Sequence, residues 1–325
     1  MKIGKISESV LKRTIIKEIK YKNKYVKKGA AIGNDATVLN LGGKEMVTSM
    51  ATYSGQLLLS AKRSFASAIN SVSAKRAVPV AVNVSFWLPE AVKESRLREA
   101  IVWMVEEGQR YGIQVSGGHT ETDGKTEVPV VTVSAFGYLE GTYEEERERV
   151  KPGMDIVMVG ETGIEGTAVL AIEKNEELLN RFTERYVDVG KTYSDELVVA
   201  SEAAVAIQHG ERAMHDVSKS GVFGALWELG EYLKLGVDVD LKSIPVRQET
   251  IELCEYFDLN PYLLCGSGAL LIVTENGKTL ADKYTQKGRR AAVIGHITQG
   301  HDRIVRNGDE KRFLEAPKSG KKECI

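Results

Sequence analysis

Two short polar segments in the first half of the chain carry side chains that could contact a ligand. Asp35 follows Gly33 and Asn34, a place where an aspartate either contacts a ligand or fixes a turn. His119 lies in the segment Gly-Gly-His-Thr-Glu (117–121), where a histidine is either a ligand or a structural group. The paired glycines there allow either close approach of the backbone to a ligand or a tight turn.

A third polar segment, His-Asp-Val-Ser-Lys-Ser-Gly (215–221), precedes an apolar pattern that predicts a helix. The N-terminus of a helix attracts anions through its free N–H groups. Lys219 would strengthen that attraction, whereas Asp216 or Ser218 could simply cap the helix. The segment therefore indicates either an anion-binding helix start or an ordinary cap.

A glycine-rich segment, Gly-Glu-Thr-Gly-Ile-Glu-Gly (160–166), lies between a predicted strand and a predicted helix. Its glycines do not have the spacing of a dinucleotide-binding loop. Close packing between strand and helix explains the segment about as well as contact with a phosphate.

The elements that must position these segments alternate between strand and helix patterns. Apolar and β-rich runs predict strands, and apolar residues at helical spacing predict helices. In the first half we expect strands over 46–48, 77–88 and 128–139 and a helix over 90–111. In the second half we expect strands over 155–160, 270–274 and 291–297, a helix from 167, and helices over 194–208 and 221–235. The mixture predicts an α/β or α+β protein.

A charged stretch, Thr-Tyr-Glu-Glu-Glu-Arg-Glu-Arg-Val (142–150), is followed by Lys-Pro-Gly. Such a stretch is typical of a solvated turn between domains. We therefore divide the chain into domains at 1–150 and 151–325, with a polar tail from about 315. A length of 325 residues leaves room for two such domains.

Composition excludes several classes of function. Lys and Arg number 44 against 45 Asp and Glu, so no net field attracts nucleic acid or an anionic membrane. The longest apolar runs are far shorter than the ~20 residues that a membrane span needs. The first residues lack the apolar core of a signal peptide, and three cysteines form no disulfide framework. These features predict a cytoplasmic protein.

Read in order, five segments resemble one superfamily, which contains aminoimidazole ribonucleotide (AIR) synthetase, thiamine-phosphate kinase, selenophosphate synthetase and the hydrogenase-maturation protein HypE. Their spacing spans nearly the whole chain, and the closest resemblance is to the HypE-like group of AIR synthase-related proteins. The segments cover residues 33–36, 70–79, 117–121, 151–171 and 215–230, with a weaker sixth at 266–273.

The resemblance implies a two-domain fold of the α/β (α+β) class. The N-terminal domain of such proteins pairs its sheet with that of a second copy to form a β-barrel, and the C-terminal domain is an α/β sandwich. ATP lies in a cleft beside the barrel, where aspartates bind it with Mg²⁺. The resemblance therefore implies a homodimer, ATP as a cofactor, and a nucleotide or phosphate-containing small molecule as partner.

Matching positions give the candidate site. The candidates for catalysis are Asp35, Glu121 and Asp216, of which Asp35 and Asp216 are also the remaining candidates for metal binding. The candidates for binding nucleotide or phosphate are Asp35, Asn70, Arg76, Gly117, Gly118, His119, Thr120, His215 and Lys219.

The sequence departs from the family pattern at its carboxylates. Ala51 and Ser71 stand where relatives carry aspartate, and Lys219 stands where they carry an acid. Arg76 replaces a family glycine. These changes remove negative charge and add positive charge, which argues against Mg²⁺ and suggests either an anion bound without metal or simple loss of catalysis.

Two functions remain open. The favoured one is a nucleotide- or phosphate-anion-binding paralogue with weakened or lost ATP-dependent catalysis. The alternative is an active HypE-like ATP-dependent enzyme, of the hydrogenase-maturation type or a small-molecule kinase. Cys324 stands near the position of the carrier cysteine of HypE, but it lacks the Pro-Arg-Ile that precedes that cysteine, so a bystander thiol is the favoured interpretation.

Overall fold

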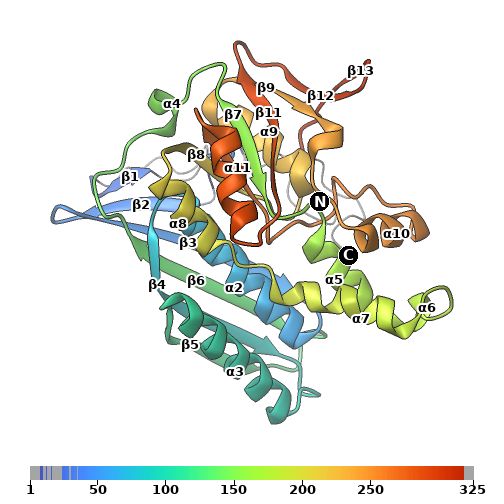
Figure 1. The fold of residues 1–325 in the computed structure, drawn as a ribbon. Helices are drawn as coiled ribbons and strands as arrows, with labels where there is room; N and C mark the ends of the chain where they lie inside the picture. Colours follow the sequence, from blue (N-terminus) through green and yellow to red (C-terminus); the bar gives the residue numbers. More distant parts are fainter. Residues whose placement is uncertain are drawn as a thin grey trace.

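The computed structural model describes residues 24–28, 31–34 and 36–317, together with the isolated positions 8, 9, 12 and 16. Two sheets, one from each half of the chain, lie on either side of helix α2 (Leu57–Ser73) (Figure 1). Almost every residue of α2 is buried, because it contacts both the first sheet and the helices of the second half.

The first sheet has six strands in the order β1-β2-β3-β6-β4-β5, and it is open at both edges. Neighbouring strands are antiparallel except β4 and β5, which are parallel. The bounds are β1 (Val26–Lys28), β2 (Ala36–Leu41), β3 (Lys44–Ser54), β4 (Val78–Leu88), β5 (Gln114–Thr122) and β6 (Val130–Tyr138).

One face of this sheet is covered by helices. Phe65, Ile69 and Val72 of α2 pack into the core of the first half together with Met104 of α3 (Glu94–Tyr111). The Gln56 side chain caps α2 by accepting a hydrogen bond from the backbone of the first turn.

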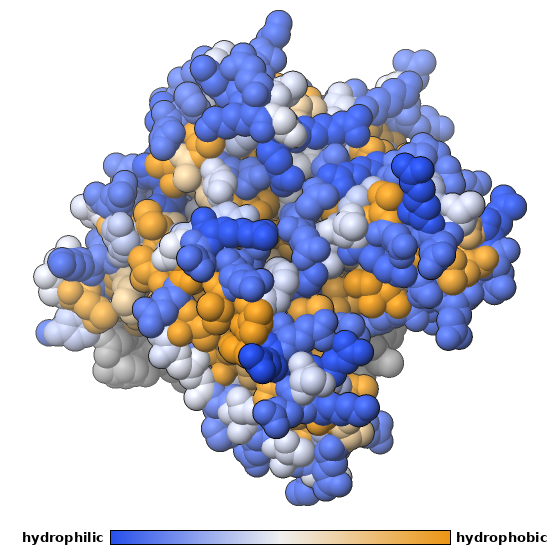
Figure 2. All heavy atoms as spheres, turned by 60° about the horizontal axis from the view of Figure 1, so that its bottom comes forward, coloured by the Kyte–Doolittle hydropathy of each residue, from blue (hydrophilic) through white to orange (hydrophobic). Residues whose placement is uncertain are grey.

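The other face of the first sheet carries large apolar side chains at the surface. Met50, Val80, Trp87 and Tyr138 are each at least 40% exposed. In Figure 2, which turns the bottom of Figure 1 forward, apolar surface gathers near the middle of that side. The alternation of buried and exposed residues along β3 and β4 follows from one covered and one uncovered face.

The second sheet has seven strands in the order β13-β12-β9-β11-β7-β10-β8, all antiparallel except β9 and β12. Helix α9 covers one face, and α8 and α11 cover the other. The bounds are β7 (Asp155–Val159), β8 (Glu211–Asp216), β9 (Gly236–Asp240), β10 (Leu270–Thr274), β11 (Ala291–Thr298), β12 (Arg303–Asn307), β13 (Glu310–Phe313), α8 (Ala200–Gln208), α9 (Gly221–Leu233) and α11 (Gly277–Gln286).

Shorter elements connect these layers. They are α4 (Glu146–Arg149), α5 (Ile164–Glu173), α6 (Asn175–Leu178), α7 (Glu184–Thr192), η2 (Tyr193–Asp195), η3 (Leu241–Ser243) and α10 (Gln248–Tyr256). A separate small core joins α5, α7 and α10 through Leu170, Val187 and Leu253. Within the described ranges, no helix is long and apolar enough to cross a membrane.

The predicted α/β class and the α/β sandwich of the second half are confirmed, whereas the first sheet does not close into a barrel within one chain. Two local predictions are wrong. The predicted helix over 194–208 is broken into η2 and α8. The stretch 142–150 is not a solvated turn, because it contains α4 and buries Glu146 and Val150.

Candidate functional site

The predicted site residues that lie together are found where α2 faces the carboxyl end of β8. The Ser71 Oγ atom is 3.3 Å from Asp216 Oδ2 and 3.1 Å from the Ser67 carbonyl, so its proton is shared between two acceptors. Ser71 and Asp216 are both buried. A hydroxyl therefore faces Asp216 from position 71, where the family resemblance leads us to expect a carboxylate.

His215 is the neighbour of Asp216 on β8, and it is also buried. Its Nε2 atom lies 3.3 Å from Glu228 Oε2 on α9, with both side chains only 8% exposed. This contact joins the last residues of β8 to the helix that follows them. His215 therefore helps to hold α9 beside Asp216.

Lys219 crosses from the start of α9 to the first sheet. Its Nζ atom donates to the Thr52 carbonyl at 3.1 Å and lies 4.3 Å from the centre of the Tyr53 ring. The Arg63 guanidinium lies 4.3 Å from the same ring. Burial, with the nearby Glu165 carboxylate, raises the pKa of the Tyr53 hydroxyl. Two cations thus flank a tyrosine that remains neutral.

Arg63 also anchors α2 to the glycine-rich segment. Its Nε atom donates to Glu165 Oε1 at 2.7 Å, and the Ser267 backbone N–H donates to Glu165 Oε2 at 3.1 Å. Burial opposes ionisation of Glu165, but Arg63 and Ser267 lower the pKa of this carboxyl below its usual value. The ion pair is therefore complete without a ligand.

Close packing accounts for the glycines of the segment 160–166. A Cβ atom on Gly160 would lie 2.3 Å from the Gly268 carbonyl, and one on Gly166 would lie 2.3 Å from Leu264 Cγ. Glu161 of the same segment accepts a hydrogen bond from Arg247 at 3.1 Å. Of the two interpretations that the sequence left open, the structure favours packing of strand against helix.

Asn70 differs from its predicted role as a ligand-binding residue. It is completely buried, its Nδ2 donates to the Leu197 carbonyl at 2.8 Å, and its Oδ1 accepts from the Val199 N–H at 2.9 Å. Asn70 therefore fixes the segment before α8 to α2. Both bonds fall where the predicted helix over 194–208 is interrupted.

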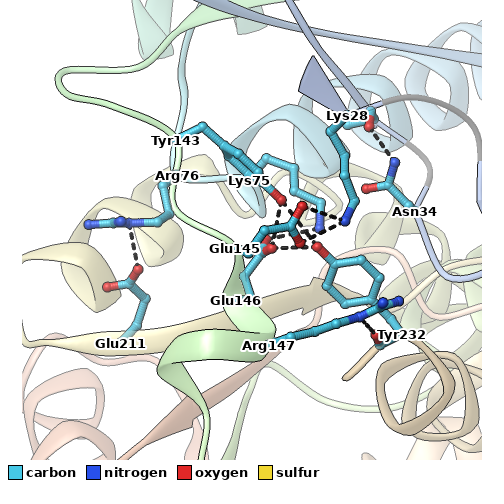
Figure 3. Close-up of polar contacts among 11 residues, drawn as sticks. Lys28, Asn34, Lys75, Arg76, Tyr143, Glu145, Glu146, Arg147, Glu211 and Tyr232 are labelled. Atoms are coloured by element: carbon cyan, nitrogen blue, oxygen red, sulfur yellow. Dashed lines mark hydrogen bonds and ion pairs between the residues drawn. The ribbon is translucent and has the colours of Figure 1, made fainter. Parts of the chain in front are cut away.

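Arg76 also differs from its predicted role in the cleft. Its Nε lies 2.7 Å from Glu211 Oε1, and its Nη1 lies 3.5 Å from Glu144 Oε2. Figure 3 shows Arg76 paired with Glu211, apart from the other side chains drawn. The residue has φ 64°, a left-handed conformation that glycine, the residue expected here from the family resemblance, adopts without strain.

The segment 117–121 lies on β5, the edge strand of the first sheet. His119 Nε2 is 3.1 Å from Glu121 Oε2, and both side chains are exposed, as is Thr120. Gly117 and Gly118 are in the strand rather than in a tight turn, and a Cβ on Gly118 would clash with the Val84 carbonyl.

Three strand spacings separate β5 from β3, or about 14 Å. Within one chain, the exposed group on β5 is therefore not joined to Asp216 and Lys219. The candidate site accordingly divides into a buried part beside α2 and a separate surface part on the edge strand.

Asp35 and Cys324 lie outside the described residues. Gly33 is described and packs tightly against α9, since a Cβ there would lie 2.7 Å from the Glu228 carbonyl. In the part of the chain that the structure describes, no three His, Cys, Asp or Glu side chains are grouped to hold a metal ion. Next to Ser71, the described donor set is the Asp216 carboxylate together with the Ser71 hydroxyl, which does not make a Mg²⁺ site by itself.

Sequence reasoning missed Tyr53, Arg63 and Glu165, which complete the buried part of the site. Tyr53 could have been found as the buried-face neighbour of Ala51, because residues two apart on a strand share a face. The pairing of Arg63 with Glu165 has no local signal, since 102 residues separate the two.

Comparison with known proteins defines the family. The AIR synthase related protein N-terminal domain matches residues 33–139, and the C-terminal domain of the same family matches residues 151–307. The chain belongs to the AIR synthase-related family.

Individual relatives agree with this assignment. The carbamoyl dehydratase HypE of Rhodobacter capsulatus is 25% identical over 244 residues, which cover 73% of this chain and 69% of the relative. A chain of a solved HypE–HypF complex gives a TM-score of 0.78 at 17% identity, covering 95% of this chain and all of that one. HypE in complex with ATP gives 0.70 at 18% identity, covering 99% and 97%. The structural likeness shows the same fold.

Proposed function

We propose that this chain is a HypE-like protein that binds a nucleotide or another phosphate-bearing small molecule beside α2 and the start of α9, with weakened or lost ATP-dependent catalysis. The observation that carries the proposal is the contact between Ser71 and Asp216 at 3.3 Å. It leaves one carboxylate where the family resemblance leads us to expect two, and the hydroxyl provides Asp216 with a partner that needs no metal.

The charges around this contact support an anionic ligand. Ala51 offers no carboxylate on β3, while Lys219 brings a positive charge to the first residues of α9. A phosphate group between these elements would meet Lys219 and the positive end of the α9 dipole. The Gly221, Phe223 and Gly224 N–H groups already donate to backbone carbonyls, so the attraction is one of charge. Arg76 is not part of this proposal, because it pairs with Glu211.

ATP is the first ligand to test, because a HypE structure with the same fold has been solved in complex with ATP. No step of the proposal uses Mg²⁺. Loss of the carboxylates that place the cation would slow phosphoryl transfer more than it would weaken nucleotide binding, because the cation neutralises charge that develops in the transition state.

An active ATP-dependent enzyme is the second candidate. His215 and Asp216 are retained, and relatives at about 25% identity include a carbamoyl dehydratase. In this alternative Asp216, with Asp35 and Glu121, would carry the catalytic role. ATP turnover separates the two candidates.

We also propose a homodimer through the first sheet. The uncovered face presents Met50, Val80 and Trp87, and β5 leaves an open edge. Pairing with a second copy would remove this apolar area from water. A HypE relative has been solved in complex with HypF, so a protein of that kind is a further partner to test.

Calorimetric titration with ATP, ADP and inorganic phosphate, each with Mg²⁺ and with EDTA, tests the function. We expect ATP to bind in both conditions with similar affinity and to be hydrolysed far more slowly than about 10 per second. Binding that needs Mg²⁺, together with turnover near that rate, would establish the enzyme instead. Absence of binding to all three would reject both candidates.

A further inference from the structure

A buried polar cluster lies at the end of α9 that is remote from Asp216. This Tyr232 cluster consists of Tyr232 on α9, Tyr143 and Glu146 in the connection between the sheets, and Lys75 just after α2. Figure 3 shows the four side chains pointing toward one another.

The other three members meet at the Glu146 carboxylate. Both tyrosine hydroxyls donate to Glu146 Oε2, that of Tyr143 at 2.9 Å, and Lys75 Nζ donates to Glu146 Oε1 at 3.0 Å. The two hydroxyls are 3.2 Å apart. Glu146 and Lys75 are at most 5% exposed.

The ring of Tyr232 is surrounded by cations from separate parts of the chain. Lys75 Nζ lies 4.2 Å from the ring centre, Lys28 Nζ 4.9 Å and the Arg147 guanidinium 5.2 Å. Lys28 of β1 also pairs with Glu145 at 2.8 Å, and Arg147 donates to the Tyr232 carbonyl. Tyr232 thus contacts both the first sheet and the segment that connects the two sheets.

Such a cluster resists small changes of geometry. Burial opposes ionisation of Glu146, but Lys75 and the Tyr232 hydroxyl lower the pKa of this carboxyl to about 2. A buried charge that loses one partner is left uncompensated in a medium of low dielectric constant. Moving α9 away from α2 would break these bonds together.

The elements that the cluster fixes are the elements that carry the candidate site. Helix α9 begins at Gly221, two residues after Lys219, and ends at Tyr232 and Leu233, about 20 Å further on. Ser71 lies one helical turn before Lys75. Gly33, two residues before Asp35, packs against Tyr232, since a Cβ there would lie 3.1 Å from Tyr232 Cβ.

We propose that Tyr232 and Glu146 are positioning residues for the nucleotide site. They hold α9 at the angle to α2 that places Asp216 opposite Ser71 and brings Lys219 to Thr52. They contact no ligand themselves. The proposal rests on the proposed function for its ligand, but the geometry it describes exists without one.

The test compares two variants that each remove one buried hydroxyl from the full-length protein. Tyr232→Phe removes a bond that joins both halves of the chain. Tyr284→Phe removes the bond to the Glu202 carbonyl, 2.6 Å long and internal to the second half. We expect ATP affinity to fall by about five-fold or more in Tyr232→Phe, as for coupled sites, and to stay within two-fold in Tyr284→Phe.

A second readout does not depend on the ligand. Hydrogen exchange of the backbone amides of 215–221 and 57–73 should become faster in Tyr232→Phe and stay unchanged in Tyr284→Phe. Equal changes in both variants, in affinity and in exchange, would reduce the cluster to a general stabilising role and overturn the proposal. So would normal affinity and normal exchange in Tyr232→Phe.

Two further results keep the outcome clear. If Tyr232→Phe does not fold, Tyr143→Phe removes the longer of the two hydroxyl bonds to Glu146 and is measured in its place. If the unaltered protein binds neither ATP, ADP nor phosphate, the proposed function fails. Hydrogen exchange alone then decides whether Tyr232 and Glu146 position the two helices.

Discussion

Replacing Ser71 by aspartate would place a carboxylate opposite Asp216, as expected from the family resemblance. The present hydroxyl oxygen is 3.3 Å from Asp216 Oδ2, so a carboxylate at position 71 would bring two negative charges to about 4 Å. At an effective dielectric constant of about 20, their repulsion is about 4 kcal/mol. Allowing for side-chain movement, we expect Ser71→Asp to lower the free energy of unfolding by about 2–4 kcal/mol at pH 7.

Acid should remove this penalty. The repulsion raises the pKa of one carboxyl of the pair in the folded protein above its value in the unfolded chain. The destabilisation is therefore complete above the raised pKa and disappears as the pH falls below the unfolded value near 4. Chemical denaturation at pH 7 and pH 4 measures the difference, and Ser71→Asn, which has nearly the same shape without charge, is the matched control.

Magnesium should reverse the effect at neutral pH. A cation between the two carboxylates would replace repulsion by attraction, so millimolar MgCl2 should raise the melting temperature of Ser71→Asp and leave Ser71→Asn unchanged. If Ser71→Asp is as stable as Ser71→Asn at pH 7 and does not respond to Mg²⁺, position 71 does not face Asp216.

Three further changes test separate parts of the structure. Asn70→Ala leaves the Leu197 carbonyl and the Val199 N–H without the side chain that bonds them. Urea denaturation should therefore show that the free energy of unfolding falls by about 2–4 kcal/mol, whereas the same change at a surface asparagine should alter it little. Arg76→Ala should leave the affinity for ATP or phosphate within two-fold in calorimetry, and a ten-fold loss would return Arg76 to the site. In the unaltered protein, the lowered pKa of Glu146 stabilises the fold above about pH 4.5, and this contribution is lost as the carboxylate is protonated toward pH 2. Glu146→Gln should therefore lose less stability than the unaltered protein between about pH 4.5 and 2. An unchanged acid profile in Glu146→Gln would contradict that assignment.

The elements that sequence patterns predicted well are those whose burial is nearly continuous. Strand β10 (270–274) is buried at every residue and matches its predicted bounds. Strand β4 and helix α9 begin or end within two residues of prediction. Local apolar periodicity decides such elements, since one or both faces must be removed from water.

The errors fall where distant partners override local patterns. The predicted helix over 194–208 is interrupted because the Val199 N–H bonds to the Asn70 side chain, 129 residues away, instead of continuing a helix. Within the charged stretch 142–150, Glu146 is buried because its carboxylate meets Lys75 and Tyr232. Charged residues in sequence predict exposure, and only the fold reveals their partners.

Arg76 and Lys219, the two cations that the sequence predicted in one cleft, have different roles in the structure. Arg76 compensates Glu211, a carboxylate 1% exposed whose pKa is raised by burial in spite of Arg76 and Arg149. The charge of Arg76 therefore stabilises the fold and does not contribute to ligand binding. Lys219 remains exposed beside the first residues of α9, so the positive character of the site rests on this residue, the helix N-terminus and the missing carboxylates. An anion held mainly by one exposed lysine is screened by salt, and its affinity should fall steeply between low and physiological ionic strength.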